Sequence, residues 1–232
     1  MKIRYLYLIL MIMAFTVVDA QQNVGKEILK GKFTDVRDSK QYSWVLIGDQ
    51  TWMAENLNIS IIIDPRNGQI TNNAIQALCY DDDEVNCTAF GGLYSWEVID
   101  QYISDEGVKC ICPVGWHLPT DSEWQVLIDY LGGDKVAGGS LKEAGITHWD
   151  KPNTGATNSS GFSALASGLF STSLGGFINK GGACHFWTSS LNKLYSEENN
   201  AYVTRFLLKR NASVSISMGV KGEAYSVRCI KD

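Results

Sequence analysis

Six cysteines limit what this 232-residue chain can fold into. An even number of cysteines in an exported chain favours disulfide bridges over metal binding or thiol chemistry. No two of them have the C-x-x-C spacing, so zinc-ribbon and thioredoxin-like folds lose support. Six cysteines can pair in many ways, and the pattern alone does not choose among the pairings. The six are Cys79, Cys87, Cys110, Cys112, Cys184 and Cys229.

The first twenty residues have the layout of a cleavable secretory signal. Lys2 and Arg4 precede an apolar run over residues 5–18, which is shorter than the roughly 20 residues that a membrane-spanning helix needs. Small or apolar residues then precede Gln21, as a signal cleavage site requires. An uncleaved anchor is the alternative. The pattern predicts a signal peptide over 1–20, a tail over 21–31 and one domain over 32–232. We expect a secreted or cell-surface protein with no membrane span in the mature chain.

The charge pattern argues against a nucleic-acid partner. The chain carries 20 Lys and Arg against 25 Asp and Glu, a net charge of −5. The basic residues are scattered and form no stripe, whereas phosphate binding needs clustered positive charge. We therefore expect no nucleic acid to bind.

The beginning of the domain predicts a β-hairpin. Tyr42, Trp44 and Leu46 recur at every second position, which is the period of a half-buried strand. Gly48-Asp49 signals a turn, and residues 51–53 resume the sheet. Residues 33–36 are a further short strand candidate.

The clearest helix is predicted over residues 120–131. Thr120 and Glu123 match a capping box, in which each side chain bonds the backbone N–H of the other residue. Asp121 lies in the first turn, where the helix dipole favours an acid. Apolar residues then repeat at helical spacing, and Gly132-Gly133 ends the helix. The apolar residues are Trp124, Leu127, Ile128 and Leu131.

The remaining segments complete an α+β pattern. A helix is expected over 93–103 and a short one over 140–144, while 57–92 and 146–182 look like irregular loops. Strands are expected at 185–189, 201–208 and 224–230, with a further one at 213–218. Strands and helices are not arranged in alternating βα units, so we expect an α+β rather than an α/β fold.

Several blocks of sequence, taken together and in order, resemble one family. They are IGDQTWMAENL (47–57), CYDDDEVNC with FGGLYSW (79–96), CPVGWHLPTDSEW (112–124), GFSAL (161–165), FWTSS (186–190) and SVRCIKD (226–232). The chain resembles the Fibrobacter succinogenes major paralogous domain (FISUMP) over about residues 32–232. Members are known mainly as exported or surface proteins, and the resemblance implies no established activity.

The LPT-x-x-EW core and the terminal VRC are also similar to the formylglycine-generating-enzyme branch of C-type-lectin-like folds. This resemblance implies two helices flanking a twisted antiparallel sheet, with long loops, disulfides and paired first and last strands. The oxidase activity of that branch depends on a reactive cysteine pair. No C-x4-C pair precedes a C-terminal strand here, so that activity is not carried over.

The matched blocks suggest how the cysteines pair. Cys112 and Cys229 lie in two of these blocks and are expected to form a long-range bridge. Cys79 and Cys87 are paired by proximity. Cys110 and Cys184 then remain for a third bridge, with a reactive Cys110 as the alternative.

A cluster of acids inside the Cys79–Cys87 loop is the one candidate metal site. Asp81, Asp82, Asp83 and Glu84 offer the oxygen ligands that calcium prefers. The loop lacks the spacing of an EF-hand, and a solvated acidic loop is the alternative interpretation. No cofactor other than calcium is expected.

Four residues in or beside the loops are candidates for binding a ligand. Lys151-Pro152-Asn153 is similar to the E-P-N triplet of calcium-dependent lectins, but a lysine replaces the acid and would repel calcium. Sugar binding by stacking stays open, with core packing as the alternative. The candidates are Trp149, Asn153, Trp187 and Tyr195. The three histidines are far apart and are expected to be structural.

Three functions remain open. The first is an exported non-enzymatic binding or adhesion module whose loops meet a glycan or a surface protein. The second is a structural subunit of a bacterial surface assembly. The third is an enzyme on a fold like that of the formylglycine-generating enzymes, which would require a reactive cysteine or a metal.

Overall fold

A computed structural model describes residues 28–59, 77–100, 111–192 and 201–232. The predicted signal peptide and most of the predicted tail lie outside these ranges. The described residues form two open, largely antiparallel sheets with four α-helices, so the expected α+β class is confirmed. No helix within the described ranges is long and apolar enough to cross a membrane.

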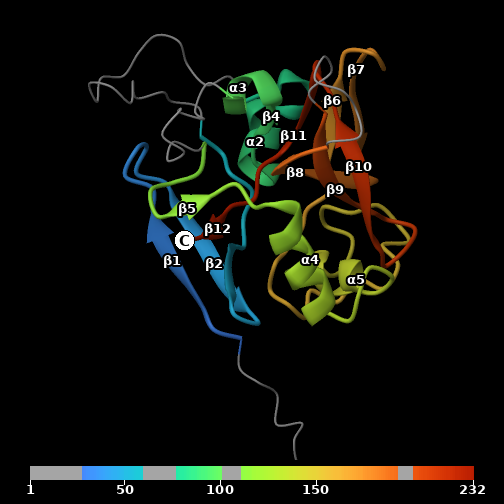
Figure 1. Cartoon of the computed structure of the whole chain (residues 1–232). Coiled ribbons are helices and arrows are strands. Elements are labelled where there is room, and N and C mark those ends of the chain that lie inside the picture. The colour runs from blue at the N-terminus through green and yellow to red at the C-terminus, as the bar shows by residue number, and fades with distance from the viewer. Residues whose placement is uncertain (1–27, 60–76, 101–110, 193–200) are drawn as a thin grey trace, which may run out of the picture.

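The first sheet contains the predicted hairpin. Its strands, in spatial order, are β1 (Lys30–Thr34), β2 (Gln41–Ile47), β3 (Gln50–Met53), β12 (Ile230–Lys231) and β5 (Trp116–His117). All neighbours are antiparallel, and Trp44 lies opposite Met53 as the hairpin requires. β1 begins inside the predicted tail. The expected pairing of the first and last strands is wrong, because β12 pairs with β3 and β5. The first and last described strands share a sheet without being neighbours (Figure 1).

The second sheet has seven strands and forms the other half of the molecule (Figure 1). Its spatial order is β10 (Val214–Gly219), β9 (Tyr202–Leu208), β8 (Ala183–Leu191), β11 (Glu223–Ser226), β6 (Ser167–Ser171) and β7 (Gly176–Lys180), with β4 (Leu93–Ser95) paired to β11. The β6–β7 hairpin lies in a segment expected to be loop. The strand expected over 224–230 is two strands, β11 and β12, in different sheets.

The helix α4 (Asp121–Tyr130) begins with the predicted capping box. The Thr120 hydroxyl oxygen accepts a hydrogen bond from the Glu123 N–H at 3.1 Å, and Glu123 Oε2 accepts one from the Thr120 N–H at 2.7 Å. Asp121 also accepts a bond from the buried Arg205 of β9, at 2.6 Å. This ion pair fixes the start of α4 to the second sheet.

The other helices differ from the expectations. The helix expected over 93–103 is a strand over its first turn, because Leu93–Ser95 pairs with β11, and α3 is only Trp96–Asp100. Its expected last residues lie outside the described ranges. The helix α5 is Ala137–Leu141, a few residues earlier than expected. The helix α2 (Glu84–Phe90) and a 3-10 turn at Tyr80–Asp82 occupy a segment expected to be irregular.

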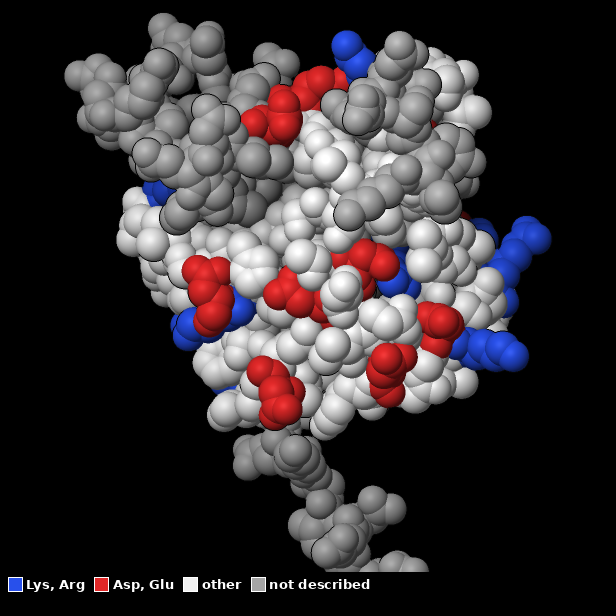
Figure 2. All heavy atoms as spheres, viewed as in Figure 1, with Lys and Arg blue, Asp and Glu red and all other residues white. Residues whose placement is uncertain are grey.

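Two apolar clusters hold the sheets and helices together. One packs α4 between the first sheet and strands β8 to β10, with Trp52, Trp124 and Phe162 at its centre. The other joins the opposite face of the hairpin to β4, α3 and β11. The predicted core stripe of α4 is confirmed for Trp124, Leu127 and Ile128, which are fully buried. Figure 2 shows mainly acidic side chains over the middle of the face that carries α4, with the basic ones mostly near its edges.

The described residues contain two disulfides, Cys79–Cys87 and Cys112–Cys229. Cys184 is a free thiol in the core. Burial raises the pKa of this thiol to about 12, so it stays protonated and is a poor nucleophile. Because Cys184 is a free thiol, the expected third bridge to Cys110 is not formed. Cys110 itself lies outside the described residues.

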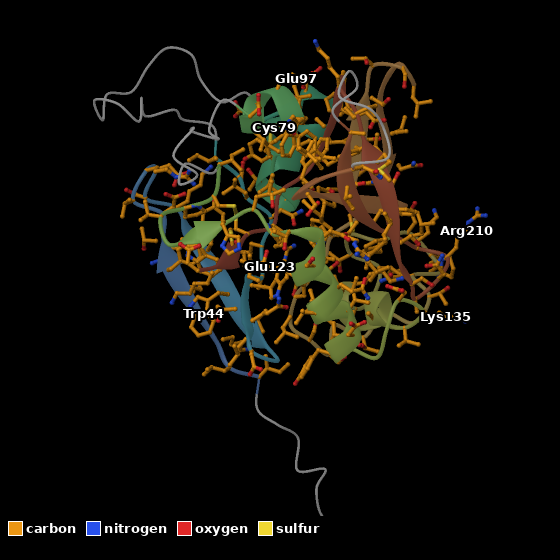
Figure 3. All side chains as sticks on the ribbon, viewed as in Figure 1. Trp44, Cys79, Glu97, Glu123, Lys135 and Arg210 are labelled. Carbon is orange, nitrogen blue, oxygen red and sulfur yellow. A yellow bond between two sulfur atoms is a disulfide. The ribbon has the colours of Figure 1, made fainter. Side chains whose placement is uncertain are left out.

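His117 joins the capping box of α4 to the end of the chain. Its Nε2 lies 2.8 Å from Glu123 Oε1, and its Nδ1 lies 2.7 Å from Asp232 Oδ1. Glu123 lies where α4 meets the first sheet (Figure 3). Burial alone would lower the pKa of His117, but the hydrogen bonds to the two carboxylates together outweigh it and raise the pKa above 6.5. This histidine was expected to be structural, and each of its ring nitrogens contacts a carboxylate within the fold.

We expect His117 to make stability depend on pH. A base with a raised folded pKa stabilises the fold below its unfolded value and loses that contribution as the pH rises through the folded value. The difference in unfolding free energy between wild type and His117→Gln should therefore be largest below pH 6.5 and shrink above it. Urea unfolding at a series of pH values measures this difference. Substituting the exposed Val114 by Gln should give a pH-independent difference. A gap for His117→Gln that is constant with pH would contradict the assignment.

Candidate functional site

The two tryptophans named as candidates for stacking on a sugar are in the core. Trp149 and Trp187 are buried, so neither ring is open to a ligand, and this prediction is wrong. The Trp149 indole N–H donates to the Ala164 carbonyl oxygen at 2.9 Å. The Trp187 indole N–H donates to the Tyr94 carbonyl oxygen at 2.7 Å. Both polar edges are satisfied inside the fold, which is the usual condition for burying a tryptophan.

The other two candidates differ from one another. Asn153 is buried, and its amide donates to the carbonyl oxygens of Glu143 and Gly145 at 2.9 and 2.7 Å. It therefore shapes a loop rather than facing a ligand. Tyr195 lies outside the described residues.

The acidic loop has a structural use for one of its acids. Asp83 caps α2, because its Oδ1 accepts a hydrogen bond from the Val85 N–H at 2.9 Å. Asp81, Asp82 and Glu84 are exposed. Over the ranges that the structure describes, no three His, Cys, Asp or Glu side chains gather in a way that could hold a metal ion. The four acids are thus spread over a turn and a helix start instead of converging on one point.

A groove of about 910 Å³ is the candidate site that emerges from the fold. It is bordered by the β1–β2 hairpin, by residues 54–58, by the end of α2 and by the loop over 143–165. We call this feature the groove. It brings together segments that are far apart in the sequence, and part of it is the loop region to which the sequence assigned ligand binding.

The first wall of the groove is one face of the hairpin. Lys32 lies opposite Ser43 and Lys30 lies opposite Val45, so these four side chains share a face. Gly161 packs against Val45 at one end of this face. Its φ is +74°, and a Cβ there would lie 3.1 Å from Val45 Cγ2, so glycine permits the loop to approach the strand closely. Towards Lys32 and Ser43 the face is more open, since Lys32 is exposed and Ser43 is half-buried.

The second wall carries a carboxylate–histidine pair. The Nδ1 atom of His148 lies 2.8 Å from Glu143 Oε1 and 3.0 Å from Oε2, and the backbone N–H of His148 donates to the same carboxylate. The buried Asn153 amide holds the Glu143 carbonyl, as described above. The ring of Phe90 meets the imidazole edge-on, with centroids 5.2 Å apart. These contacts form a wall that is polar on one side and aromatic on the other.

The end of α2 is held in place by the buried interior. Asn56 Nδ2 donates to the Phe90 carbonyl oxygen at 2.8 Å, and Asn58 Nδ2 donates to that of Cys87 at 3.0 Å. Gly91 follows with φ +80°, and a Cβ there would lie 2.6 Å from Asn56 Cβ. The oxygen of Asn56 in turn accepts two bonds from Arg228. The groove is therefore built on the central polar network of the protein.

Sequence reasoning missed these groove residues for definite reasons. The period-two pattern of β2 does point to a shared face, but it does not show where the covering loop ends. Glu143 and His148 are five residues apart on no regular element, and only the folded loop makes them neighbours. Their spacing could not have been recognised as a pair.

Comparisons with known proteins place the chain in a family without naming an activity. The family model described as the Fibrobacter succinogenes major domain matches residues 45–231, which is most of the chain. No curated protein and no solved structure matches it. The matched range begins within β2 and spans β3, α4 and the disulfides Cys79–Cys87 and Cys112–Cys229. The chain therefore belongs to the Fibrobacter succinogenes major domain family.

Proposed function

We propose that this protein is an exported, non-enzymatic binding module that takes an oligosaccharide in the groove. The observation that supports this proposal is the lining of the groove, which combines hydroxyl, amide and charged side chains with the half-buried ring of Phe90. Saccharides offer many hydroxyl groups and small apolar faces, and such a lining complements both. The volume is in the range of small-ligand sites, roughly 300–1,000 Å³.

Export and a lectin-like architecture belong to the same proposal. The signal-like residues 1–20 and two disulfides support an oxidising destination. A sheet that contains both the first and the last described strands supports a C-type-lectin-like relationship. A glycan-binding role suits a module at the cell surface.

The enzyme hypothesis has less support. It requires a reactive cysteine or a metal, and the buried thiol of Cys184, with its raised pKa, has the opposite character. Binding without chemistry is the simpler use of this groove.

A glycan array tests the proposal, with the chain from Gln21 onward applied with calcium and with a chelator. Thr88 is exposed and lines the groove, so Thr88→Trp should fill it and weaken binding at least about tenfold, which is ~1.4 kcal/mol. Val85 is exposed on the same helix but does not line the groove, so Val85→Trp should bind like wild type. Equal binding by both variants would place the ligand elsewhere. Oligomers that grow with concentration, without any glycan binding, would favour the structural-subunit hypothesis.

A further inference from the structure

Two ammonium groups in the groove lack an acidic partner. Lys30 and Lys32 both line it, both are exposed, and they lie on the same face of β1 because one residue separates them. Across the described ranges, neither makes an ion pair or a side-chain hydrogen bond. The third lysine of the groove is already engaged, since the Lys40 ammonium donates to the Asn58 carbonyl oxygen and lies 3.8 Å from Asp38 Oδ2.

The carboxylates of the groove are not placed to neutralise these two lysines. Glu143 is bound by both the ring and the backbone N–H of His148. Glu55 accepts a hydrogen bond from the Ser43 N–H at 2.9 Å through one oxygen. Among its described lining residues the groove thus holds two ammonium groups without an ion-pair partner, on a chain whose net charge is −5. Unpaired ammonium groups attract an anionic ligand to this place.

The spacing of the free ammonium groups suits a repeating anion. Residues two apart on a strand are separated by about 7 Å, so Lys30 and Lys32 present two charges in a row along β1. The rest of the lining includes Thr88 and Phe90, which offer a hydroxyl and an aromatic ring. A chain of sugars that carries carboxylate groups would satisfy both sides at once.

We propose that the groove binds an acidic oligosaccharide, with uronic-acid carboxylates on Lys30 and Lys32 and sugar hydroxyls on the opposite wall. This inference rests on the proposed function and specifies its ligand class. Both lysines are exposed to solvent, so salt screens their attraction for carboxylates. Affinity for the acidic ligand therefore falls as the salt concentration rises.

Calorimetric titration of the chain from Gln21 onward with an oligogalacturonate tests the inference. The matched ligand is the same oligosaccharide with its carboxylates methyl-esterified, which keeps the ring and removes the charge. The acid should bind about tenfold more tightly than the ester. Raising the salt concentration from about 50 to about 500 mM should weaken binding of the acid and leave binding of the ester unchanged.

Two variants connect the effect to the lysines. The double substitution Lys30→Gln and Lys32→Gln should remove the preference for the acid. Lys135→Gln should keep it, because Lys135 is exposed on another part of the molecule and does not line the groove (Figure 3).

Each other outcome overturns a definite statement. If the acid and the ester bind equally, with or without the lysines, the anionic class is wrong and oligosaccharide binding stands. If an oligoglutamate peptide binds as tightly as the uronate with the same dependence on the lysines, the saccharide assignment is wrong. If neither the acid nor the ester binds and the glycan array is blank, the proposed function fails as well.

Discussion

Replacing Arg228 by Ala is expected to lower the free energy of unfolding by about 3–5 kcal/mol, a large share of the roughly 5–15 kcal/mol that stabilises an ordinary protein. Arg228 follows β11 near the end of the chain, and its side chain is completely buried. Burial lowers its pKa to about 9, so the guanidinium is still charged at neutral pH. A buried charge is tolerated only where polar groups surround it.

The guanidinium connects three separate segments. It donates to Asn56 Oδ1 from Nε at 3.0 Å and from Nη2 at 2.5 Å. Its Nη1 donates to the Met53 and Phe162 carbonyl oxygens at 3.1 and 2.5 Å. Its planar group also lies over the Phe162 ring, 4.4 Å from the centroid. Alanine would leave all these acceptors buried without a donor and open a cavity beside the ring.

The matched control for this prediction is Arg210→Ala. Arg210 is exposed and points away from the body of the molecule (Figure 3), so its loss should change stability by no more than about 0.5 kcal/mol. Arg228→Lys serves if the alanine variant does not fold. It keeps the charge but has one nitrogen in place of three, so it should be destabilised less than the alanine variant. Urea unfolding followed by tryptophan fluorescence measures each loss. A loss for Arg228→Ala as small as for Arg210→Ala would show that the network contributes nothing.

The hairpin and α4 could be predicted because short stretches of sequence determine them. The hairpin over 41–53 follows from a period-two pattern interrupted by Gly48, and α4 follows from a capping box and an apolar stripe. Both kinds of signal act within a few residues, so a sequence displays them directly.

The secondary structure was predicted wrongly mainly where strands pair with segments far away in the sequence. Leu93–Ser95 has apolar spacing that suits a helix, but its backbone pairs with β11, more than a hundred residues later. The β6–β7 hairpin is rich in Gly and Ser, which have low strand propensity, and it is held by its neighbours in the sheet. In both cases tertiary contacts outweigh local preference.

Buried charges were equally hidden from a reading of the sequence. Lys142 is buried, and its ammonium donates to the carbonyl oxygens of Thr154, Leu208 and Asn211 at 2.9, 3.1 and 2.8 Å. Lysine is rarely buried, so a sequence places it at the surface by default. The loop around the groove is nevertheless fixed from inside by this lysine and by Asn153. The candidate site could be located only after these interior contacts were known.

The long disulfide is expected to contribute as much to stability as the Arg228 network. Cys112 and Cys229 are 117 residues apart, and closing a loop of that length removes unfolded-state entropy worth about 4.9 kcal/mol. The double substitution Cys112→Ala and Cys229→Ala should therefore lower the free energy of unfolding by roughly that amount. Both cysteines belong to the cluster beneath the first sheet, and the Cys229 carbonyl oxygen accepts a bond from the Met53 N–H at 3.0 Å.

The short disulfide provides the internal comparison, because chemistry is the same and only the loop differs. Cys79 and Cys87 are 8 residues apart, and the same entropy relation gives about 2.6 kcal/mol for their bridge. Urea unfolding of both double-alanine variants under non-reducing conditions should thus show the larger loss for the long bridge. Equal losses would mean that native packing around the sulfurs, rather than loop length, sets what each bridge contributes. The short bridge also holds α2, so its removal should weaken ligand binding in the groove. Removal of the long bridge should mainly lower the free energy of unfolding.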